Sequence, residues 1–330
     1  MTSTATVLVS SAGRRVELLR AFREALADLG LEGRVLAADR SWYSSAGHSA
    51  DAHFAVPSCD RPEFVPRMVE LCAEQHVDLV VPTIDTELPV LAAARDEFAA
   101  VGATIAVSAP AVVEIAGDKV ATHSWLTAHG FPTVRQSTLA EVRAGGRCWP
   151  FPLVVKPRFG SAAKGVAVVT DAKELDVAAR AGEVVVQTVA EGDEYTVDAL
   201  VDRAGRWVCA VPRRRLEVRA GEVAKAVTVH SPVLERLAAE ICEALPGAYG
   251  ALAIQVFAGE GFTDPTVIEL NARFGGGFPL SRQAGADFPR WILEEIVGLP
   301  SSAHADGWRD GLVMLRYDAA VFVSDEGSPG

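Results

Sequence analysis

The chain has 330 residues, of which 49% are hydrophobic and 22% are charged, and its formal net charge is −12. This length predicts about two domains, or three small ones, and the composition is rich enough in apolar residues to exclude a mainly disordered chain. Proteins that wrap nucleic acid usually carry a positive excess, so the acidic total argues against a nucleic-acid partner.

Other features of the sequence indicate where the protein works. No apolar run approaches the ~18 residues that a membrane span needs, and the N-terminus lacks the basic region of a signal peptide. The five cysteines are odd in number and show no CxxC spacing. We therefore expect no membrane contact, no disulfide framework and a reducing, cytoplasmic location.

The first third of the chain alternates short apolar strands with helical patterns. Strands are predicted over 6–10, 34–39, 77–82 and 104–108, and helices over 16–26, 63–76 and 86–101. Runs that are apolar throughout indicate strands that are buried on both faces. The alternation therefore predicts a parallel sheet with helices on both sides.

The sequence changes character from about residue 117 and indicates an α+β region with antiparallel sheets. Strands are predicted over 153–156, 166–169, 183–189, 195–202, 206–216, 251–257 and 266–271. Helices are predicted over 119–128, 171–181 and 232–245, with a loop of small residues over 159–165. The fold class is therefore α/β, followed by an α+β region.

The densest chemical signal is the segment 267–277, VIELNARFGGG. Because strand side chains alternate faces, Glu269, Asn271 and Arg273 point the same way, and Gln255 on the preceding strand adds an oxygen across the hairpin. Carboxylate and amide oxygens suit Mg²⁺, and the guanidinium suits phosphoryl oxygens. A half-exposed strand explains the alternation, but it does not explain three glycines directly after the arginine.

A second signal is the segment 154–165, VVKPRFGSAAKG. Lys156 stands at a strand end and is followed by a loop of small residues, whose backbone N–H groups could approach an anion closely. The GxxxxGK[ST] pattern of a Walker A loop is absent. An ordinary glycine-rich turn beside a solvated lysine is the alternative interpretation.

A third signal is the segment 184–198, VVVQTVAEGDEYTVD, in which an apolar strand meets a short loop and then a strand that carries Glu194. Such a hinge offers backbone groups to a purine edge and a carboxylate to ribose hydroxyls. Without the other two signals, a plain hairpin would be the better interpretation.

These three segments, in this order and spacing, resemble the ATP-grasp superfamily, and most closely its carbamoyl-phosphate-synthase-like members and single-chain carboxylate–amine ligases. The resemblance covers about residues 110–300. The N-terminal third, including 9–22 and 82–91, resembles the Rossmann-like domain that precedes ATP-grasp domains. The resemblance implies a Rossmann-like domain at 1–115, a small lobe with a glycine-rich lid at 116–190, and a large lobe with the metal and substrate site at 191–330.

The resemblance also implies roles for individual residues. ATP is expected to contact Lys119, Lys156, Gly160, Ser161, Gly165, Gln187, Thr188, Val189, Ala190 and Glu194. The expected ligands of Mg²⁺, or alternatively Mn²⁺, are Gln255, Glu269 and Asn271. Arg273, Lys156 and Arg215 are the expected catalytic residues. Two positions depart from many relatives: Gln187 replaces a glutamate, and Gln255 replaces the carboxylate of D-alanine–D-alanine-type ligases, as it does in the carbamoyl-phosphate-synthase-like group.

Arginines gather in VPRRRLEVRAGE, where alternation places Arg213 and Arg215 on one face with Glu217. We expect Arg213 and Arg215 to bind the substrate carboxylate or the acylphosphate, although a solvated edge strand would show the same pattern. Lys225 adds a phosphate contact. The remaining predicted substrate contacts are Gly275, Gly276, Asp85 and Glu87.

A weaker signal lies at Gly13, Arg14 and Arg15, in a strand-to-helix turn where an anion could bind. The GxGxxG fingerprint of a dinucleotide site is missing there, so the preferred interpretation is a domain that supports the ATP-grasp lobes and lines one wall of the cleft.

The sequence therefore predicts an ATP-dependent ligase that joins a small-molecule carboxylate to an amine through an acylphosphate and releases ADP and phosphate. The alternatives are carboxyphosphate or carbamoyl chemistry on bicarbonate, a non-catalytic nucleotide-binding protein, and a nicotinamide dehydrogenase. A homodimer is left open.

Overall fold

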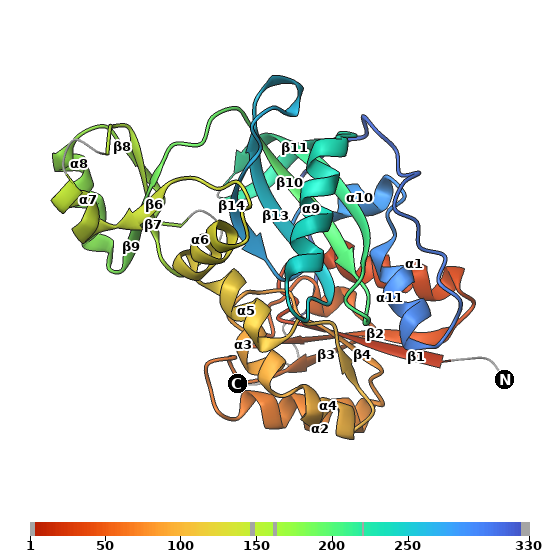
Figure 1. The fold of residues 1–330 in the computed structure, drawn as a ribbon. Helices are drawn as coiled ribbons and strands as arrows, with labels where there is room; N and C mark the ends of the chain where they lie inside the picture. Colours follow the sequence, from red (N-terminus) through yellow and green to blue (C-terminus); the bar gives the residue numbers. More distant parts are fainter. Residues whose placement is uncertain (1–3, 146–148, 161–163, 220, 325–330) are drawn as a thin grey trace.

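The computed structural model describes residues 4–145, 149–160, 164–219 and 221–324. Their strands form three sheets, which follow one another along the chain in the order parallel, antiparallel, antiparallel (Figure 1). This arrangement confirms the predicted α/β fold, with a parallel first sheet and antiparallel later sheets. None of the helices in these ranges is long and apolar enough to cross a membrane.

The first sheet has five parallel strands in the order β3-β2-β1-β4-β5. Its strands are β1 (Thr4–Ser10), β2 (Glu32–Asp39), β3 (Ala52–Ala55), β4 (Leu79–Val81) and β5 (Thr104–Ile105). Its helices are α1 (Val16–Asp28), α2 (Phe64–Gln75), α3 (Leu88–Ala93) and α4 (Arg95–Ala100), with a 3₁₀ turn η1 (Gly47–Ser49). The helix predicted over 86–101 is divided into α3 and α4 at Ala94, and β3 was not predicted.

A four-stranded antiparallel sheet forms a small lobe that projects to the left in Figure 1. Its strands are β6 (Gln136–Thr138), β7 (Leu153–Pro157), β8 (Ala167–Val169) and β9 (Val184–Thr188). Helices α7 (Leu139–Gly145) and α8 (Ala172–Ala178) and the 3₁₀ turn η3 (Ala179–Ala181) accompany it. Its own apolar cluster includes Val142, Leu153, Val155, Leu175 and Val186, so the lobe has a separate core.

The third sheet has six antiparallel strands in the order β14-β13-β10-β11-β12-β15. They are β10 (Asp193–Val201), β11 (Trp207–Arg219), β12 (Glu222–Thr228), β13 (Gly250–Ala258), β14 (Thr266–Asn271) and β15 (Val313–Leu315). Helices α9 (Pro232–Ala244), α10 (Phe278–Gln283) and α11 (Phe288–Ile296) and the 3₁₀ turn η4 (Glu260–Phe262) complete this part. Strands β12 and β15 were not predicted.

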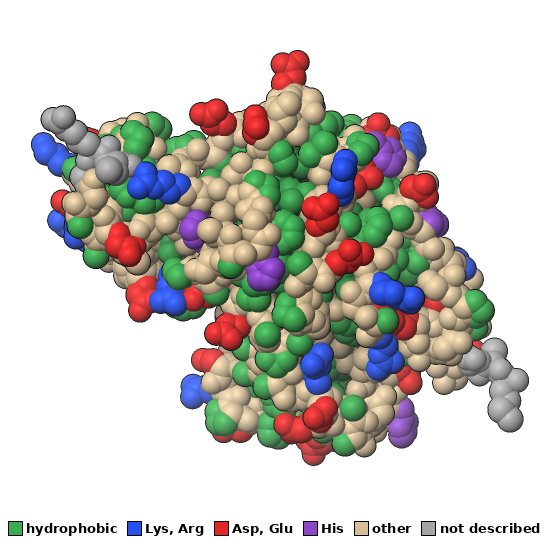
Figure 2. All heavy atoms as spheres, in the orientation of Figure 1, with side chains coloured by type: hydrophobic (Ala, Val, Ile, Leu, Met, Phe, Trp, Pro, Cys, Tyr) green, Lys and Arg blue, Asp and Glu red, His purple; other side chains and the backbone are tan. Residues whose placement is uncertain are grey.

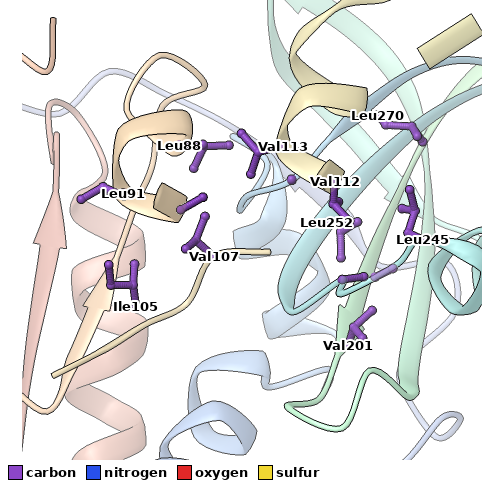
Figure 3. Packing of buried hydrophobic residues seen from close by; sticks show 14 of the residues in the cluster. Leu88, Leu91, Ile105, Val107, Val112, Val113, Val201, Leu245, Leu252 and Leu270 are labelled. Carbon is purple, nitrogen blue, oxygen red and sulfur yellow. The ribbon is translucent and has the colours of Figure 1, made fainter. Parts of the chain in front are cut away.

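Helices α5 (Pro110–Gly117) and α6 (Lys119–Ala128) connect the first sheet to the rest of the chain. Apolar side chains from α3, α5 and the six-stranded sheet form one continuous cluster, in which Val112 and Val113 lie between Leu88 and Leu252 (Figure 3). Helices α10 and α11 also pack against α1. The first sheet and the large sheet therefore share a core, while the domain boundaries at 115 and 190 stay predictions.

On the surface shown in Figure 2, acidic and basic side chains are scattered among hydrophobic and uncharged groups. No extended patch of one charge sign is visible on that face. Several cationic side chains are instead gathered in a cavity between the three sheets.

Candidate active site

A cavity of about 610 Å³ lies where the small lobe, the six-stranded sheet and the loop after β4 meet. Its wall includes residues from β7, β9, β10, β11, β13 and β14. Seven cationic side chains line it, against four carboxylates: Arg15, Lys119, Lys156, Lys164, Arg213, Arg215 and Arg273 against Asp85, Glu194, Glu222 and Glu269. A protein with a net charge of −12 thus concentrates positive charge in its cavity, which favours an anionic ligand.

The predicted metal ligands lie together on β13 and β14. Gln255 and Glu269 are directly paired across the two antiparallel strands, and Asn271 follows two residues later on the same strand. Asn271 donates from Nδ2 to the carbonyl of Ala253 at 3.4 Å. Strand alternation and hairpin register therefore bring the three side chains to one wall of the cavity, as the sequence predicted.

The carboxylate of Glu269 is in a site suited to a cation. Burial raises its pKa, whereas the charges of Lys119 and Lys156 oppose that rise. Within the described ranges, no hydrogen-bond donor contacts this carboxylate, and no group of three or more His, Cys, Asp and Glu side chains has metal-binding geometry. The residues present therefore fit a Mg²⁺ site made of one carboxylate and two amide oxygens.

Lys156 lies on β7 with only 9% of its surface exposed. Burial lowers its pKa, Glu269 and Glu194 oppose that change, and Lys119 adds to it. No hydrogen bond of its ammonium group is found among the described residues, whereas Nζ of Lys119 donates to the carbonyl of Gly160 at 2.9 Å. Two ammonium groups beside one half-buried carboxylate leave an excess of positive charge that suits a further anion.

The start of α6 is fixed by an ion pair that the sequence analysis missed. Asp118 caps α6 by accepting from the N–H of Val120 at 2.8 Å, and it also binds the guanidinium of Arg158 at 2.6 Å. Arg158 lowers the pKa of this carboxyl group. Because Arg158 directly follows β7, this ion pair connects Asp118, the neighbour of Lys119, to the strand that carries Lys156.

The predicted hinge lies at the end of β9. Gln187 is buried and donates from Nε2 to Oε1 of Gln136 at 2.7 Å, and Gln136 in turn donates to the backbone carbonyl of Lys119 at 2.9 Å. The three residues after Gln187 also line the cavity: Thr188, Val189 and Ala190. Gln136 therefore joins the hinge to the start of α6, a link between residues far apart in the sequence.

Glu194 and Arg215, which were predicted to act separately, form an ion pair with each other across β10 and β11. Both side chains line the cavity, and Nε of Arg215 is buried without a hydrogen-bond partner in the described chain. Each charge is thus partly offset by the other. Arg215 still presents a guanidinium to the cavity, and its catalytic role stays a prediction.

Arg213, which was predicted to bind the substrate, is engaged by other residues of the protein. Its guanidinium is 1% exposed and makes two hydrogen bonds to Asp198, at 2.7 and 2.9 Å, and Asp198 also accepts from Ser281 at 2.6 Å. A Cβ atom at Gly277 would lie only 2.3 Å from Nη1 of Arg213, so glycine is required there. Arg213 therefore packs against the glycine loop at Gly277, and it also forms part of the cavity wall.

Lys225 and Glu87 were also predicted to contact the substrate, but neither residue lines the cavity. Lys225 pairs with Glu217 at 2.5 Å, on the exposed side of β12. The carboxylate of Glu87 is fully buried and accepts from the hydroxyls of Ser10 and Ser11 and from the N–H of Thr83 at 2.7 Å. Its burial raises its pKa, and it holds the loops after β1 and β4 together.

Asp85, predicted to face the acceptor, is engaged with Arg273. Nε and Nη2 of Arg273 donate to its two carboxylate oxygens at 2.8 and 2.6 Å. Nη2 of Arg273 also donates to Oδ1 of Asn271 at 3.2 Å. Asp85 comes from the first sheet and Arg273 follows β14, so this pair positions the arginine across two parts of the fold.

The glycines of the predicted lid and of the 275–277 loop differ in their placement. Gly160 lines the cavity with φ of +102°, a conformation that favours glycine, whereas Gly165 lies outside the cavity wall. Ser161 falls outside the described residues. Gly275 and Gly276 line the cavity as predicted, and a Cβ atom at Gly276 would lie 3.4 Å from Nη1 of Arg15.

Arg15 itself received little weight in the sequence analysis, yet it lines the cavity from the N-terminal end of α1. The incomplete glycine fingerprint around it was the only available signal. The position of Arg15 agrees with the preferred interpretation, in which the N-terminal domain lines one wall of the cleft.

Comparison with known families gives two matches that follow one another along the chain. Residues 7–106 match the PylC-like N-terminal domain, and residues 116–277 match the ATP-grasp domain. Among curated proteins, the phosphoribosylamine–glycine ligase of Xylella fastidiosa (strain Temecula1) is 25% identical over 248 residues, covering 63% of this chain and 55% of the relative. The chain thus spans about half the length of the curated relatives it matches.

Two solved structures share the fold over most of the chain. The biotin carboxylase domain of 2-oxoglutarate carboxylase from Hydrogenobacter thermophilus has a TM-score of 0.74 and 19% identity, covering 95% of this chain and 74% of its own. That domain was solved as a dimer with MgADP, ADP and bicarbonate. The L-amino acid ligase from Bacillus licheniformis has a TM-score of 0.67 and 20% identity, covering 92% and 76%. The two domain matches show that the chain combines a PylC-like N-terminal domain with an ATP-grasp domain.

Proposed function

We propose that the protein is an ATP-dependent ligase that joins a small-molecule carboxylate to an amine and releases ADP and phosphate. The observation that carries the proposal is the buried ammonium of Lys156, which has no hydrogen-bond partner in the described chain and faces the same cavity as Gln255, Glu269 and Asn271. A buried cation beside a set of oxygen ligands suits a nucleotide triphosphate with its metal ion.

The residues of the cavity divide into groups with different tasks. The hinge at 187–190 would meet the adenine, with Glu194 close to the ribose, and Lys119 and Lys156 would bind the phosphates. Gln255, Glu269 and Asn271 would hold Mg²⁺, or Mn²⁺ in its place, which when bound offsets negative charge on the phosphoryl oxygens. The cavity lies between three parts of the fold, which would limit the access of water to the reacting groups.

The proposed reaction has two steps. An oxygen of the substrate carboxylate attacks the γ-phosphorus, and the bond to the leaving ADP breaks, which gives an acylphosphate. The amine nitrogen then attacks the carbonyl carbon, loses a proton and expels phosphate to leave an amide. Arg273, oriented by Asp85, would stabilise charge on the transferred phosphoryl group, so the chain works mainly by positioning and electrostatics.

The names of two similar proteins support this proposal. The curated relative is named as a ligase of phosphoribosylamine and glycine, and a solved protein with the same fold is named as an L-amino acid ligase. A homodimer remains part of the proposal, because the solved biotin carboxylase domain forms one, and light scattering of the purified chain would test it.

Phosphate release from ATP and Mg²⁺ should be measured with a panel of carboxylic acids and amines, and the products should be weighed by mass spectrometry. We expect release that needs both an acid and an amine, together with a product whose mass equals their sum minus water. Glu269→Gln serves as the inactive control. Release that depends on bicarbonate alone, or nucleotide binding without any turnover across the panel, would contradict the ligase proposal.

A further inference from the structure

Arg15 is a cation without a carboxylate partner in the wall of the cavity. Its Nη2 donates to the backbone carbonyl of Thr83 at 3.3 Å, and no ion pair of its side chain is found among the described residues. The two carboxylates whose charges reach it are engaged elsewhere. Asp85 binds Arg273 at 2.6 Å, and Glu222 pairs with Arg14 and with Arg316, both at 3.0 Å.

The surroundings of Arg15 make its charge costly. Burial lowers its pKa to about 10, and the like charge of Arg273 acts in the same direction. Arg15 also precedes the first turn of α1, where the helix dipole is positive and disfavours a cation. A charged side chain in such a position would be stabilised by a nearby anion, and no carboxylate of the described residues lies at ion-pair distance from it.

The space beside Arg15 is kept open by the glycine loop after Arg273. Gly275 and Gly276 line the cavity, and an added Cβ atom at Gly276 would lie 3.4 Å from Nη1 of Arg15. Any side chain there would occupy the region in front of the guanidinium. The loop and Arg15 belong to different parts of the fold, so the opening between them is formed only when the first sheet and the large sheet are in place.

We propose that Arg15, opposite Gly276, binds an anionic group of the acceptor, a carboxylate or a phosphate that does not itself react. The acceptor would therefore be an acidic molecule. The statement that the bound molecule is the acceptor rests on the proposed function, whereas the statement that Arg15 binds an anion does not. A guanidinium gives a planar pair of donors that fits both kinds of anion, and it retains its charge at all physiological pH values.

The site can be tested by binding alone. The nucleotide site is first filled with the β,γ-imido analogue of ATP and Mg²⁺, so that Lys119 and Lys156 are occupied. Succinate, inorganic phosphate and the uncharged succinamide are then titrated separately by calorimetry. Stronger binding of succinate identifies a carboxylate ligand, and stronger binding of phosphate identifies a phosphoester, while succinamide should not bind.

Three variants test the residue. Arg15→Met should weaken binding of the preferred anion about ten-fold or more, and Arg15→Lys should restore part of it, because the charge returns without the planar fork. Gly276→Asp should abolish binding by placing a carboxylate in front of Arg15. The matched control is Arg20→Met on the same helix, whose side chain is 57% exposed and pairs with Glu17. Circular dichroism checks that each variant is folded.

Two results would overturn the inference. One is anion binding by Arg15→Met equal to that of the wild type. The other is wild-type binding of both anions no tighter than that of succinamide. Failure of the ligase proposal would look different, because it would show as the absence of amide product and would leave these titrations unchanged.

Discussion

Replacing Lys156 with methionine separates nucleotide binding from folding more sharply than any other change in the cavity. Methionine keeps much of the length of the side chain and removes the charge. The lysine is 9% exposed, and burial lowers its pKa because Glu269 and Glu194 only partly offset the loss of hydration. In the absence of ligand, the ammonium is therefore a cost to the folded state, and its removal should not lower the melting temperature.

Nucleotide binding should respond in the opposite way. A hydrogen bond between an ammonium group and a phosphate is worth about 1.5–3 kcal/mol, which corresponds to a Kd that is about 10- to 150-fold weaker when it is lost. The partial burial of Lys156 places the expected effect in the upper half of this range, because screening by water is reduced there. The variant should thus lose affinity while keeping its stability.

Calorimetric titration with the β,γ-imido analogue of ATP measures the Kd, and thermal unfolding measures the stability. Lys173→Met, an exposed lysine on α8 of the same lobe, is the matched control and should match the wild type in both measurements. An unchanged Kd for Lys156→Met would show that the lysine does not meet the phosphates. A large fall in melting temperature would refute the argument that its charge is uncompensated.

Four further predictions concern contacts outside the metal ligands. Asp85→Asn should lower kcat about 10- to 100-fold in a phosphate-release assay while leaving the Kd of the nucleotide analogue nearly unchanged, because it loosens the orientation of Arg273. Gln136→Leu should raise that Kd about 2- to 13-fold by removing the hydrogen bond to Gln187, as calorimetry can measure. Glu87→Ala should cost about 2–4 kcal/mol in urea unfolding, because it leaves buried donors unpaired. Burial raises the pKa of Glu87 above its ordinary 4.5, so ionisation of this carboxyl group lowers the stability of the folded protein at neutral pH. This loss disappears as the pH falls and the group becomes protonated. The wild type should therefore gain stability relative to Glu87→Gln between pH 7 and 4.5.

The sequence was sufficient where one local rule determines the geometry. Alternation along β14 and the register of one hairpin brought Gln255, Glu269 and Asn271 together, because both rules operate within a few residues. The same rule failed on β11. There, irregularities in the pairing with β12 on both sides of Glu217 interrupt the alternation, so Glu217 pairs with Lys225 instead of sharing a face with Arg215.

Residues that depend on distant partners could not be predicted in this way. Arg213 was expected to bind the substrate or, as the alternative, to lie on a solvated strand, but its guanidinium is buried and binds Asp198 on the neighbouring strand. Asp85 and Glu87 looked equivalent in the loop after β4. Only the folded structure shows that Asp85 binds Arg273, 188 residues away, while Glu87 accepts a hydrogen bond from Ser10.

The positions of Asp85 and Arg15 indicate that the ATP-grasp part does not form its site alone. Asp85 orients Arg273 from the loop after β4, and Arg15 closes the cavity beside Gly276 from the start of α1. The same interface is apolar underneath, since Phe22 of α1 packs edge-on against Phe274, with ring centroids 6.1 Å apart. Asp85 and Arg15 both belong to the N-terminal part of the chain, and we propose that Arg273 binds the phosphoryl group and Arg15 the acceptor. Changes in that part should therefore alter acceptor choice and turnover together. Adenine binding at the hinge of the small lobe should be affected much less.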